Sequence, residues 1–161
     1  MAVYRIFPEK DTYISSKPTV AGLYGNAGLD EIIELAGYPD QLPGYDEKFE
    51  EFQALGIDEV YCLSVNDSFV MNAWFKQQGV LNVKPIPDGS GEFTYAMGMS
   101  VNKANLGFGF RSWRYAMVVN DGEVEQLFEE PGKVGNCPVD PYEVSDPDTV
   151  LNYLKTYAQN Q

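Results

Sequence analysis

The chain has 161 residues, 44% of them hydrophobic and 14% aromatic, which is enough to bury one core, so a single compact domain is expected. Its 24 acidic and 11 basic residues give a formal net charge of −13, which repels phosphate backbones and anionic lipid surfaces. We therefore expect neither nucleic acid nor a membrane as a partner, and without a signal-peptide run or an apolar stretch of spanning length we expect a soluble, cytoplasmic protein.

The first part of the chain has weak local preference, because glycines and prolines interrupt it. Residues 3–7 are compatible with a strand, and residues 29–35 with either a strand or a helix. The pattern changes around residues 36–41. We therefore divide the chain into an N-terminal segment, residues 1–41, and a second unit, residues 42–161.

A strand followed by a helix is the clearest signal of the second unit. Residues 42–55 first carry apolar side chains at helical spacing. Residues 60–65 then form a continuous apolar run, which predicts a strand covered on both faces, as in parallel sheets. Asn66 or Asp67 is expected to cap the helix that follows. The predicted apolar face of that helix comprises Phe69, Val70, Ala73 and Trp74.

The middle of the chain is expected to hold short elements. Residues 80–86 predict a short strand, and Pro85 favours an edge position because it cannot donate to a ladder. Residues 92–97 predict one or two helical turns. The glycine-rich residues 98–110 predict a connection.

The last third of the chain predicts a hairpin and a helix. Residues 113–119 and 123–128 flank Asn-Asp-Gly, the composition of a tight hairpin turn. A capping residue and acids at residues 145–148 precede a helix with apolar positions up to residue 158. From residue 42 the order is α-β-α-β-α-β-β-α, which indicates an α/β fold.

The residue inventory restricts the chemistry. The sequence contains no histidine, which removes serine–histidine and cysteine–histidine nucleophile pairs and every zinc site that uses histidine. Two cysteines cannot build a cysteine-only zinc or iron–sulfur site within one chain. We therefore predict no metal and no cofactor, and any reaction must use thiols, carboxylates or arginines.

The two thiols differ in their expected surroundings. Cys62 lies within the buried apolar run, where a thiol behaves as a small hydrophobe of low reactivity. Cys137 is expected in a loop, where it can be oxidised or form a mixed disulfide. Its neighbours Asp140 and Glu143 oppose thiolate formation, so the redox role and the inert role of Cys137 both remain open.

The other candidate ligand groups have simpler explanations. Four acids near the C-terminus could form a calcium cluster, but they lack the loop spacing of such sites, so helix capping is preferred. They are Asp140, Glu143, Asp146 and Asp148. The glycine-rich loops complete no phosphate-binding motif. Arg111 and Arg114 bracket a tryptophan, and ion pairing with the acidic surface accounts for both.

Five motifs, in one order, carry a family resemblance. They are Leu-Pro-Gly-Tyr at residues 42–45, the run at 64–74, Pro-Asp-Gly-Ser-Gly-Glu-Phe at 87–93, Arg-Ser-Trp-Arg-Tyr at 111–115 and Glu-Val-Ser-Asp at 143–146. Through them the chain from residue 42 to about residue 157 resembles the redoxin/peroxiredoxin family, in its atypical branch related to glutaredoxin fusions. The resemblance implies a thioredoxin-like α/β fold with a central mixed sheet flanked by helices, usually in a homodimer.

The resemblance also implies a chemistry. In this family a cysteine thiolate at a helix start attacks a peroxide and becomes a sulfenic acid. A strand-borne arginine, which aligns with Arg114, lowers the pKa of that thiol and polarises the peroxide. Glutathione, glutaredoxin or thioredoxin then restores the thiol. The implied partners are therefore a peroxide and a thiol reductant.

The chain departs from the family at the attacking thiol. The Pro-x-x-x-Thr-x-x-Cys motif aligns with Asp30, Glu34 and Gly37, and neither Cys62 nor Cys137 stands in such a motif. The strand that leads into the motif is missing as well. We predict that residues 3–7 or residues 32–35 fill its place in the sheet, because buried unpaired backbone groups are costly.

Three functions follow from these observations. The first is a thiol-dependent peroxidase by family, acting on hydrogen peroxide or alkyl hydroperoxides, whose activity is impaired because the motif is absent. The second is a non-catalytic redoxin-fold module for interaction or dimerisation. The third is a hybrid chain, since residues 3–12 and 26–31 resemble the opening of virion structural proteins of marine phages.

Overall fold

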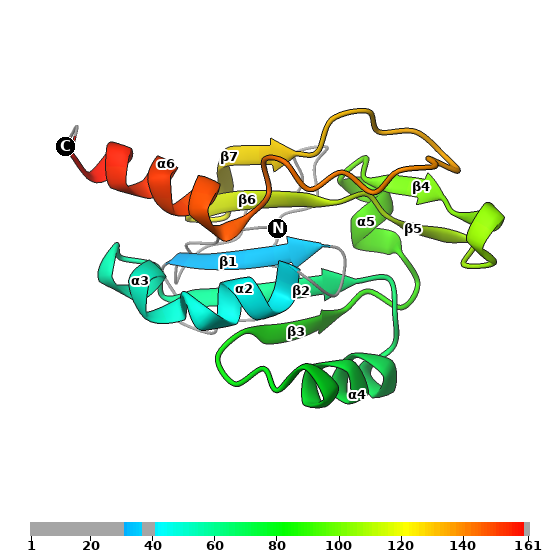
Figure 1. Cartoon of the computed structure of the whole chain (residues 1–161), viewed down its shortest axis with the longest axis horizontal. Helices are drawn as coiled ribbons and strands as arrows, with labels where there is room; N and C mark the ends of the chain where they lie inside the picture. The colour runs from blue at the N-terminus through cyan, green and yellow to red at the C-terminus, as the bar shows by residue number, and fades with distance from the viewer. Residues whose placement is uncertain (1–30, 37–40, 160–161) are drawn as a thin grey trace, which may run out of the picture.

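The computed structural model describes residues 31–36 as backbone and residues 41–159 with their side chains (Figure 1). The predictions for residues 3–7 and for the phage-like segment therefore lie outside the described residues. So do the motif positions Asp30 and Gly37.

A mixed five-stranded sheet of order β3-β2-β1-β6-β7 organises the described chain (Figure 1). The strands are β1 (Glu31–Ala36), β2 (Glu59–Ser64), β3 (Lys84–Pro87), β6 (Tyr115–Asn120) and β7 (Glu123–Glu129). The strands β1, β2 and β3 pair in parallel, whereas β6 pairs antiparallel with both β1 and β7. This is the α/β class with the central mixed sheet that the sequence predicts.

The centre of the sheet is filled by β1. Ile33 is paired with Val60 of β2 on one side and with Val118 of β6 on the other. Of the two segments predicted to take this place, residues 32–35 do so. The strands β2 and β6 thereby gain partners for backbone groups that would each cost about 1–3 kcal/mol if buried and unpaired.

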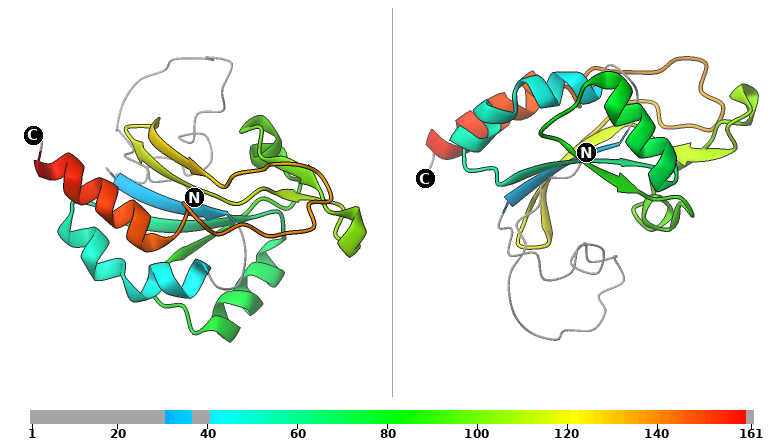
Figure 2. Two further views of the ribbon diagram at one scale, coloured as in Figure 1. Left: turned by 45° about the horizontal axis from the view of Figure 1, so that its top comes forward. Right: turned by 90° about the horizontal axis from the view of Figure 1, so that it is seen from below.

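Helices cover one face of the sheet, as Figure 2 shows most clearly in its right-hand view. They are α2 (Gln41–Glu47), α3 (Phe49–Ala54), α4 (Ser68–Gln78) and α6 (Pro147–Gln159). The other face carries α5 (Glu92–Ala96) and the two-stranded sheet of β4 (Ser100–Asn102) and β5 (Phe110–Ser112), with the 3-10 turn η1 (Ala104–Leu106) between its strands. None of the described helices is long and apolar enough to cross a bilayer.

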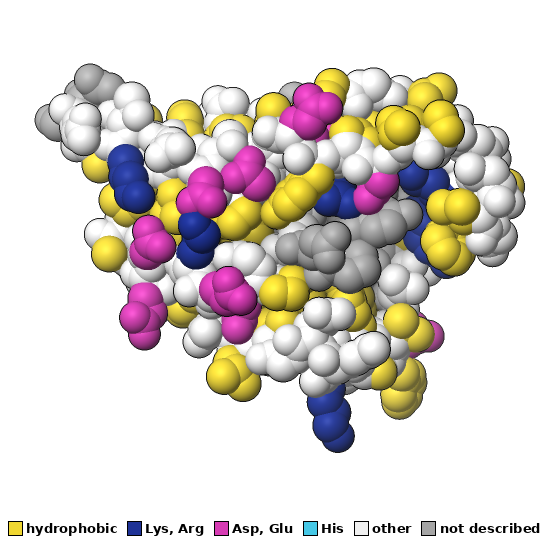
Figure 3. Space-filling view, in the orientation of Figure 1, with side chains coloured by type: hydrophobic (Ala, Val, Ile, Leu, Met, Phe, Trp, Pro, Cys, Tyr) yellow, Lys and Arg dark blue, Asp and Glu magenta, His cyan; other side chains and the backbone are white. Residues whose placement is uncertain are grey.

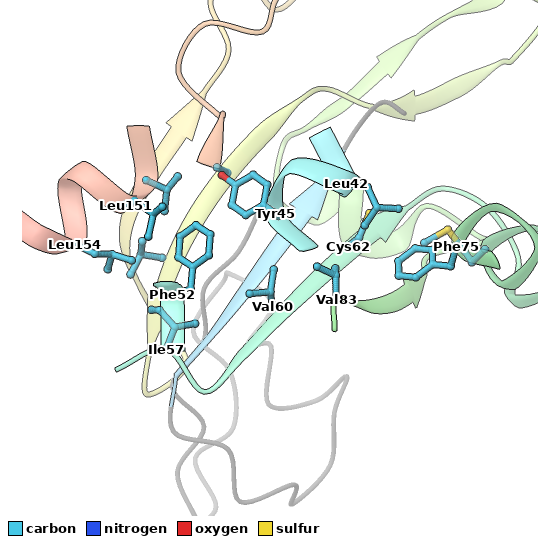
Figure 4. Packing of buried hydrophobic residues seen from close by; sticks show 14 residues of the cluster. Leu42, Tyr45, Phe52, Ile57, Val60, Cys62, Phe75, Val83, Leu151 and Leu154 are labelled. Carbon is cyan, nitrogen blue, oxygen red and sulfur yellow. The ribbon is translucent and has the colours of Figure 1, made fainter. Parts of the chain in front are cut away.

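Alternation along the strands divides the core into two clusters, because successive side chains of a strand point to opposite faces. Val60 and Cys62 of β2 join the cluster under the helices, where Figure 4 shows Cys62 beside Leu42. Tyr61 and Leu63 join the second cluster, on the face that α5 and β4 cover. The continuous apolar run of β2 thus serves both faces, as predicted.

Several local predictions are confirmed. Asp67 is the N-cap of α4, and its Oδ1 accepts a bond from the Val70 N–H at 2.9 Å. The hairpin turn has Asp121 at φ 54° and Gly122 at φ 73°, the left-handed pair that a tight two-residue turn requires. The strand β3 lies at the sheet edge, where its prolines are tolerated.

Three predictions differ from the structure. The single helix over residues 42–55 is two helices, since Lys48, at φ −101° and ψ 11°, departs from helical geometry between α2 and α3. The apolar face predicted for α4 is wrong: Met71 and Phe75, one turn apart, are buried, whereas Phe69 is 84% exposed. The connection over residues 98–110 contains β4, η1 and the start of β5, elements too short to give a periodic pattern.

Candidate functional site

Arg114 is a buried cation just before β6. Its side chain is only 5% exposed, and its Nη2 donates to the Asp140 carboxylate in an ion pair. The guanidinium also lies over the Tyr142 ring, 4.8 Å from the ring centroid. A buried guanidinium held by a carboxylate and an aromatic face is an oriented positive charge, and such a charge can bind or polarise an electron-rich oxygen.

A second buried cation lies close to the start of β6, next to which Arg114 is found. Lys103 is 5% exposed and its Nζ lies 5.3 Å from the ring centroid of Trp113, the residue before Arg114. Burial raises the pKa of Asp140 above its ordinary value, although Arg114 and Lys103 both act to lower it. Two buried cations therefore act on one carboxylate, Asp140, in a protein whose net charge is strongly negative.

The segment of residues 140–145, which provides Asp140 and Tyr142, also contacts the start of α2 through Ser145. The Gln41 side chain donates from Nε2 to the Ser145 carbonyl at 2.9 Å and to the Ser145 hydroxyl at 3.1 Å. The Tyr45 hydroxyl donates to the same carbonyl at 2.9 Å. Burial raises the pKa of Tyr45 well above its ordinary value, which keeps the hydroxyl protonated as a donor. Residues 140–145 therefore lie between Arg114 and the first turns of α2.

The two thiols lie on opposite faces of the sheet. Cys62 is 1% exposed within β2 and belongs to the cluster under the helices, as predicted for an inert thiol. Cys137, between β7 and α6, is partly buried and packs against the second cluster, so the expectation of an exposed loop thiol holds only in part. Neither cysteine lies at the start of a described helix, the position at which a thiolate gains stabilisation from the first N–H groups.

Part of the sequence that aligns with the family's motif forms a strand of the sheet. Glu34, which aligns with the motif's threonine, lies in the middle of β1 and pairs with Tyr61 and Met117. The strand β1 ends at Ala36 and α2 begins at Gln41, so four residues join them. The chain thus forms a central strand from positions that align with the attacking motif.

The acids considered for calcium have other roles. Among the described residues no group of acids, histidines or cysteines is arranged to hold a metal ion. Asp140 pairs with Arg114, and the Asp146 Oδ1 accepts bonds from the Asp148 and Thr149 N–H groups, as helix capping predicts.

Arg111 differs from Arg114 despite their spacing. Within the described part of the chain it forms no ion pair; its Nη1 donates to the Phe110 carbonyl at 2.7 Å, and the guanidinium lies 6.0 Å from the Phe108 ring centroid. Ion pairing therefore accounts for Arg114, whereas no acid of the described residues pairs with Arg111. Arg111 instead lines a cavity of about 640 Å³ together with Thr94, Tyr95 and Phe110.

Sequence reasoning found Arg114 but missed the groups around it. Gln41 is an ordinary helix residue by pattern, and Glu130, whose carboxylate accepts the N–H groups of residues 143–145, is one of 24 acids without a motif. Two motifs of the resemblance gave a signal: Leu-Pro-Gly-Tyr at residues 42–45 contains Tyr45, and Glu-Val-Ser-Asp at residues 143–146 marks the segment that these groups bind.

Comparisons with known proteins agree on one family. A family model described as redoxin matches residues 40–151. The chain is 63% identical over 116 residues to a peroxiredoxin of Synechocystis sp., across 72% of this chain and 61% of that protein. The match therefore spans only about three-fifths of that relative.

Solved structures support the same conclusion for the fold. The Plasmodium falciparum antioxidant protein, a 1-Cys peroxiredoxin, has a TM-score of 0.75 at 32% identity, over 79% of this chain and 76% of that chain. The reduced Prx3 of Vibrio vulnificus in complex with H2O2 has a TM-score of 0.70 at 33% identity, over 80% of each chain. The predicted thioredoxin-like fold is thereby confirmed.

Proposed function

Because the chain belongs to the redoxin family and is peroxiredoxin-like, we propose that it is a thiol-dependent peroxidase by family that reduces hydrogen peroxide or alkyl hydroperoxides weakly or not at all. The observation that carries this proposal is the use of residues 31–36 as the central strand, which leaves four residues before α2. Gly37 is the residue of the sequence that aligns with the attacking cysteine.

The arginine side of the site supports the peroxide part of the proposal. Arg114 is buried, and its guanidinium is oriented by Asp140 and Tyr142. We propose that this guanidinium donates to a peroxide oxygen and stabilises the charge that develops when the O–O bond breaks. A structural neighbour, the Prx3 of Vibrio vulnificus, has been solved in complex with H2O2.

The missing step is the nucleophilic one. A thiolate sulfur bonds to one peroxide oxygen, the O–O bond breaks, and the other oxygen leaves as hydroxide or alkoxide and takes up a proton. The sulfur is oxidised to a sulfenic acid, which glutathione, glutaredoxin or thioredoxin reduces. We propose one of these thiol reductants as a partner of this chain. We also propose a cytoplasmic location.

Neither remaining thiol is well suited to replace the nucleophile. Cys62 is buried in β2, and Cys137 is partly buried and packs against the second core cluster. We propose that Cys137 acts at most as a slow, redox-sensitive link to another thiol. Its position in the segment between β7 and α6 gives it partial access to solvent.

A specific observation favours a second candidate function, a dimerisation module. Exposed aromatic side chains gather near α5 and β5: Tyr95 is 78% exposed and Phe110 is 65% exposed, and both line the same cavity. Figure 3 shows hydrophobic side chains over the end that carries β4 and β5, whereas most visible acids lie toward the opposite end. We propose that the apolar end is buried in a homodimer, away from the repelling acids.

The peroxidase proposal is tested by supplying the missing sulfur. Peroxide consumption is measured with dithiothreitol for the wild-type chain, Gly37→Cys and Gln77→Cys, the last placing an ordinary thiol on the exposed surface of α4. We expect no consumption above the reductant's own rate in the wild type, and at least about a tenfold gain of Gly37→Cys over Gln77→Cys. A Gly37→Cys protein no faster than Gln77→Cys would contradict the proposal that the absent thiol is what limits the activity.

The dimer proposal has a separate test. Sedimentation is measured for the wild type and for Phe110→Asp, with Phe69→Asp as a control that changes another exposed aromatic residue on α4. We expect a dimeric wild type and control and a monomeric Phe110→Asp protein. A monomeric wild type at high concentration would rule out the module.

A further inference from the structure

Glu130 is a buried acid directly after β7, and its carboxylate accepts several bonds from one short segment. The residue is 1% exposed. Its Oε2 accepts from the Glu143 N–H at 2.8 Å, and its Oε1 accepts from the Val144 N–H at 3.0 Å and from the Ser145 N–H at 2.8 Å. The Ser145 hydroxyl donates to the same Oε1 at 2.7 Å. One side chain thus holds three consecutive residues.

The main chain of Glu130 holds the other side of the site. Its N–H donates to the Arg114 carbonyl at 3.2 Å, and its carbonyl accepts from the indole Nε1–H of Trp113 at 2.8 Å. Glu130 therefore contacts the backbone of Arg114 directly. Through its side chain it also fixes the segment whose Asp140 and Tyr142 face the Arg114 guanidinium.

The same segment transmits this restraint to α2. Ser145, which Glu130 binds through both its N–H and its hydroxyl, accepts the bonds from Gln41 and Tyr45. A single carboxylate therefore lies between the two parts of the site: the start of β6, with the arginine, and the start of α2, four residues after Gly37 in the sequence.

The bonds require an ionised carboxylate. Burial alone would raise the pKa of Glu130, but the bonds from Ser145, Glu143 and Val144 outweigh it and lower the pKa below its ordinary value. A glutamine in its place would offer one acceptor oxygen and would turn an NH2 group toward N–H donors. Charge and shape are therefore both needed.

We propose that Glu130 is a positioning residue of the candidate site. Through residues 140–145 it sets the orientation of the Arg114 guanidinium and the position of the start of α2. This inference deepens the proposed function, because it concerns the same arginine, but it needs no reacting thiol. It is therefore tested without an activity assay.

The test is nuclear magnetic resonance of the full chain, comparing Glu130→Gln with the neighbouring variant Glu129→Gln. Glu129 is a partly exposed acid paired with Lys133 at 3.0 Å, so its loss changes a surface charge only. In Glu130→Gln we expect about tenfold faster hydrogen exchange of the Ser145 amide and of the Arg114 Nε–H, and a shifted Trp113 indole signal. In Glu129→Gln we expect all three signals to match the wild type.

A general loss of stability is separated from positioning by Leu154→Ala, which opens the opposite cluster on α6. That variant is expected to leave the Arg114 and Trp113 signals in place. Should Glu130→Gln not fold, Ser145→Ala, which removes the hydroxyl bond to Glu130 and the bond that this hydroxyl accepts from Gln41, is expected to give the same change at Arg114. Unchanged Arg114 signals in the folded variant, or an equal change in Leu154→Ala, would overturn the proposal. A failed peroxidase test would leave it standing.

Discussion

The start of α2 and the start of β6 contact the same segment, residues 140–145, yet they bring unequal groups to the candidate site. The β6 side provides a buried arginine with an ion pair and an aromatic partner. The α2 side provides Gln41 and Tyr45, which bind the segment but carry no nucleophile. Of the proposed peroxide site, only the arginine side therefore carries a group that can act on a peroxide.

This difference teaches what each side depends on. The arginine side is built from contacts within residues 103–145, which belong to the part of the chain that matches the redoxin family. The α2 side, which in the family carries the attacking thiol, depends on the residues just before the part that matches the family. There the chain uses residues 31–36 to complete its sheet. A sheet can accept a replacement strand by backbone pairing alone, whereas a nucleophilic thiol cannot be replaced in this way.

The largest expected effect comes from breaking the central strand. Ile33→Pro removes an N–H from a strand paired on both sides, so we expect a loss of at least ~3 kcal/mol in the free energy of unfolding. Lys84→Pro, at the start of the edge strand β3, should cost clearly less. Urea unfolding of both variants checks this. Equal losses would mean that β1 contributes no more to the sheet than an edge strand does.

The next effect concerns the arginine side and depends on pH. Glu130→Gln should lower the free energy of unfolding by about 2–3 kcal/mol at neutral pH, since buried donors lose a charged acceptor. The folded-state pKa of Glu130 lies below the ordinary value of 4.5. The stability it contributes is therefore complete above that value and is lost as the pH falls through the folded-state pKa.

Urea unfolding at a series of pH values checks this sign. The difference between the wild type and Glu130→Gln should be constant near neutrality and should narrow only below about pH 4.5. A difference that grows on acidification would show that the carboxylate is not held in its ionised form.

A smaller effect is expected from the arginine itself. Arg114→Lys keeps the charge but loses the planar group that lies over Tyr142, so we expect a loss of about 1–2 kcal/mol. Arg111→Lys, at a position without an ion pair in the described chain, should change stability by less than about 0.5 kcal/mol. Thermal unfolding of the two variants would contradict the contrast if both lost the same amount.

The last and smallest effect concerns the reactivity of the two thiols in the unmodified chain. Cys137 should react with a soluble disulfide reagent in the folded protein, because it is only partly buried. Cys62, 1% exposed in β2, should react only after the chain unfolds. Absorbance of the released reagent counts the thiols before and after denaturant is added. Fast reaction of both thiols in the folded state would show that β2 is not covered as described.

Much of the fold could be predicted from local patterns. The apolar run of β2, the Asp67 cap and the Asn-Asp-Gly hairpin turn each carry their signal within a few residues. The strands β4 and β5 could not be predicted, because three residues show no period. The face of α4 was assigned wrongly because its apolar residues lie on more than one side, and only tertiary packing selects Met71 and Phe75.

The site was predictable only where a motif marked it. Arg114 stands in a recognisable run, but the groups that hold its surroundings are distant in sequence: Ser145 lies 104 residues from Gln41 and 15 from Glu130. No spacing rule joins such positions. The importance of Glu130 follows from the donors around it, which only the folded chain brings together.

The most direct test of the central claim is peroxide consumption by the unmodified chain. Hydrogen peroxide is followed with dithiothreitol, glutathione with glutaredoxin, or thioredoxin as the reductant, for the wild type and for Arg114→Gln. We predict that neither protein raises the rate above that of the reductant system alone. Fast consumption by the wild type that falls in Arg114→Gln would contradict the account, because it would mean that the site has a working nucleophile.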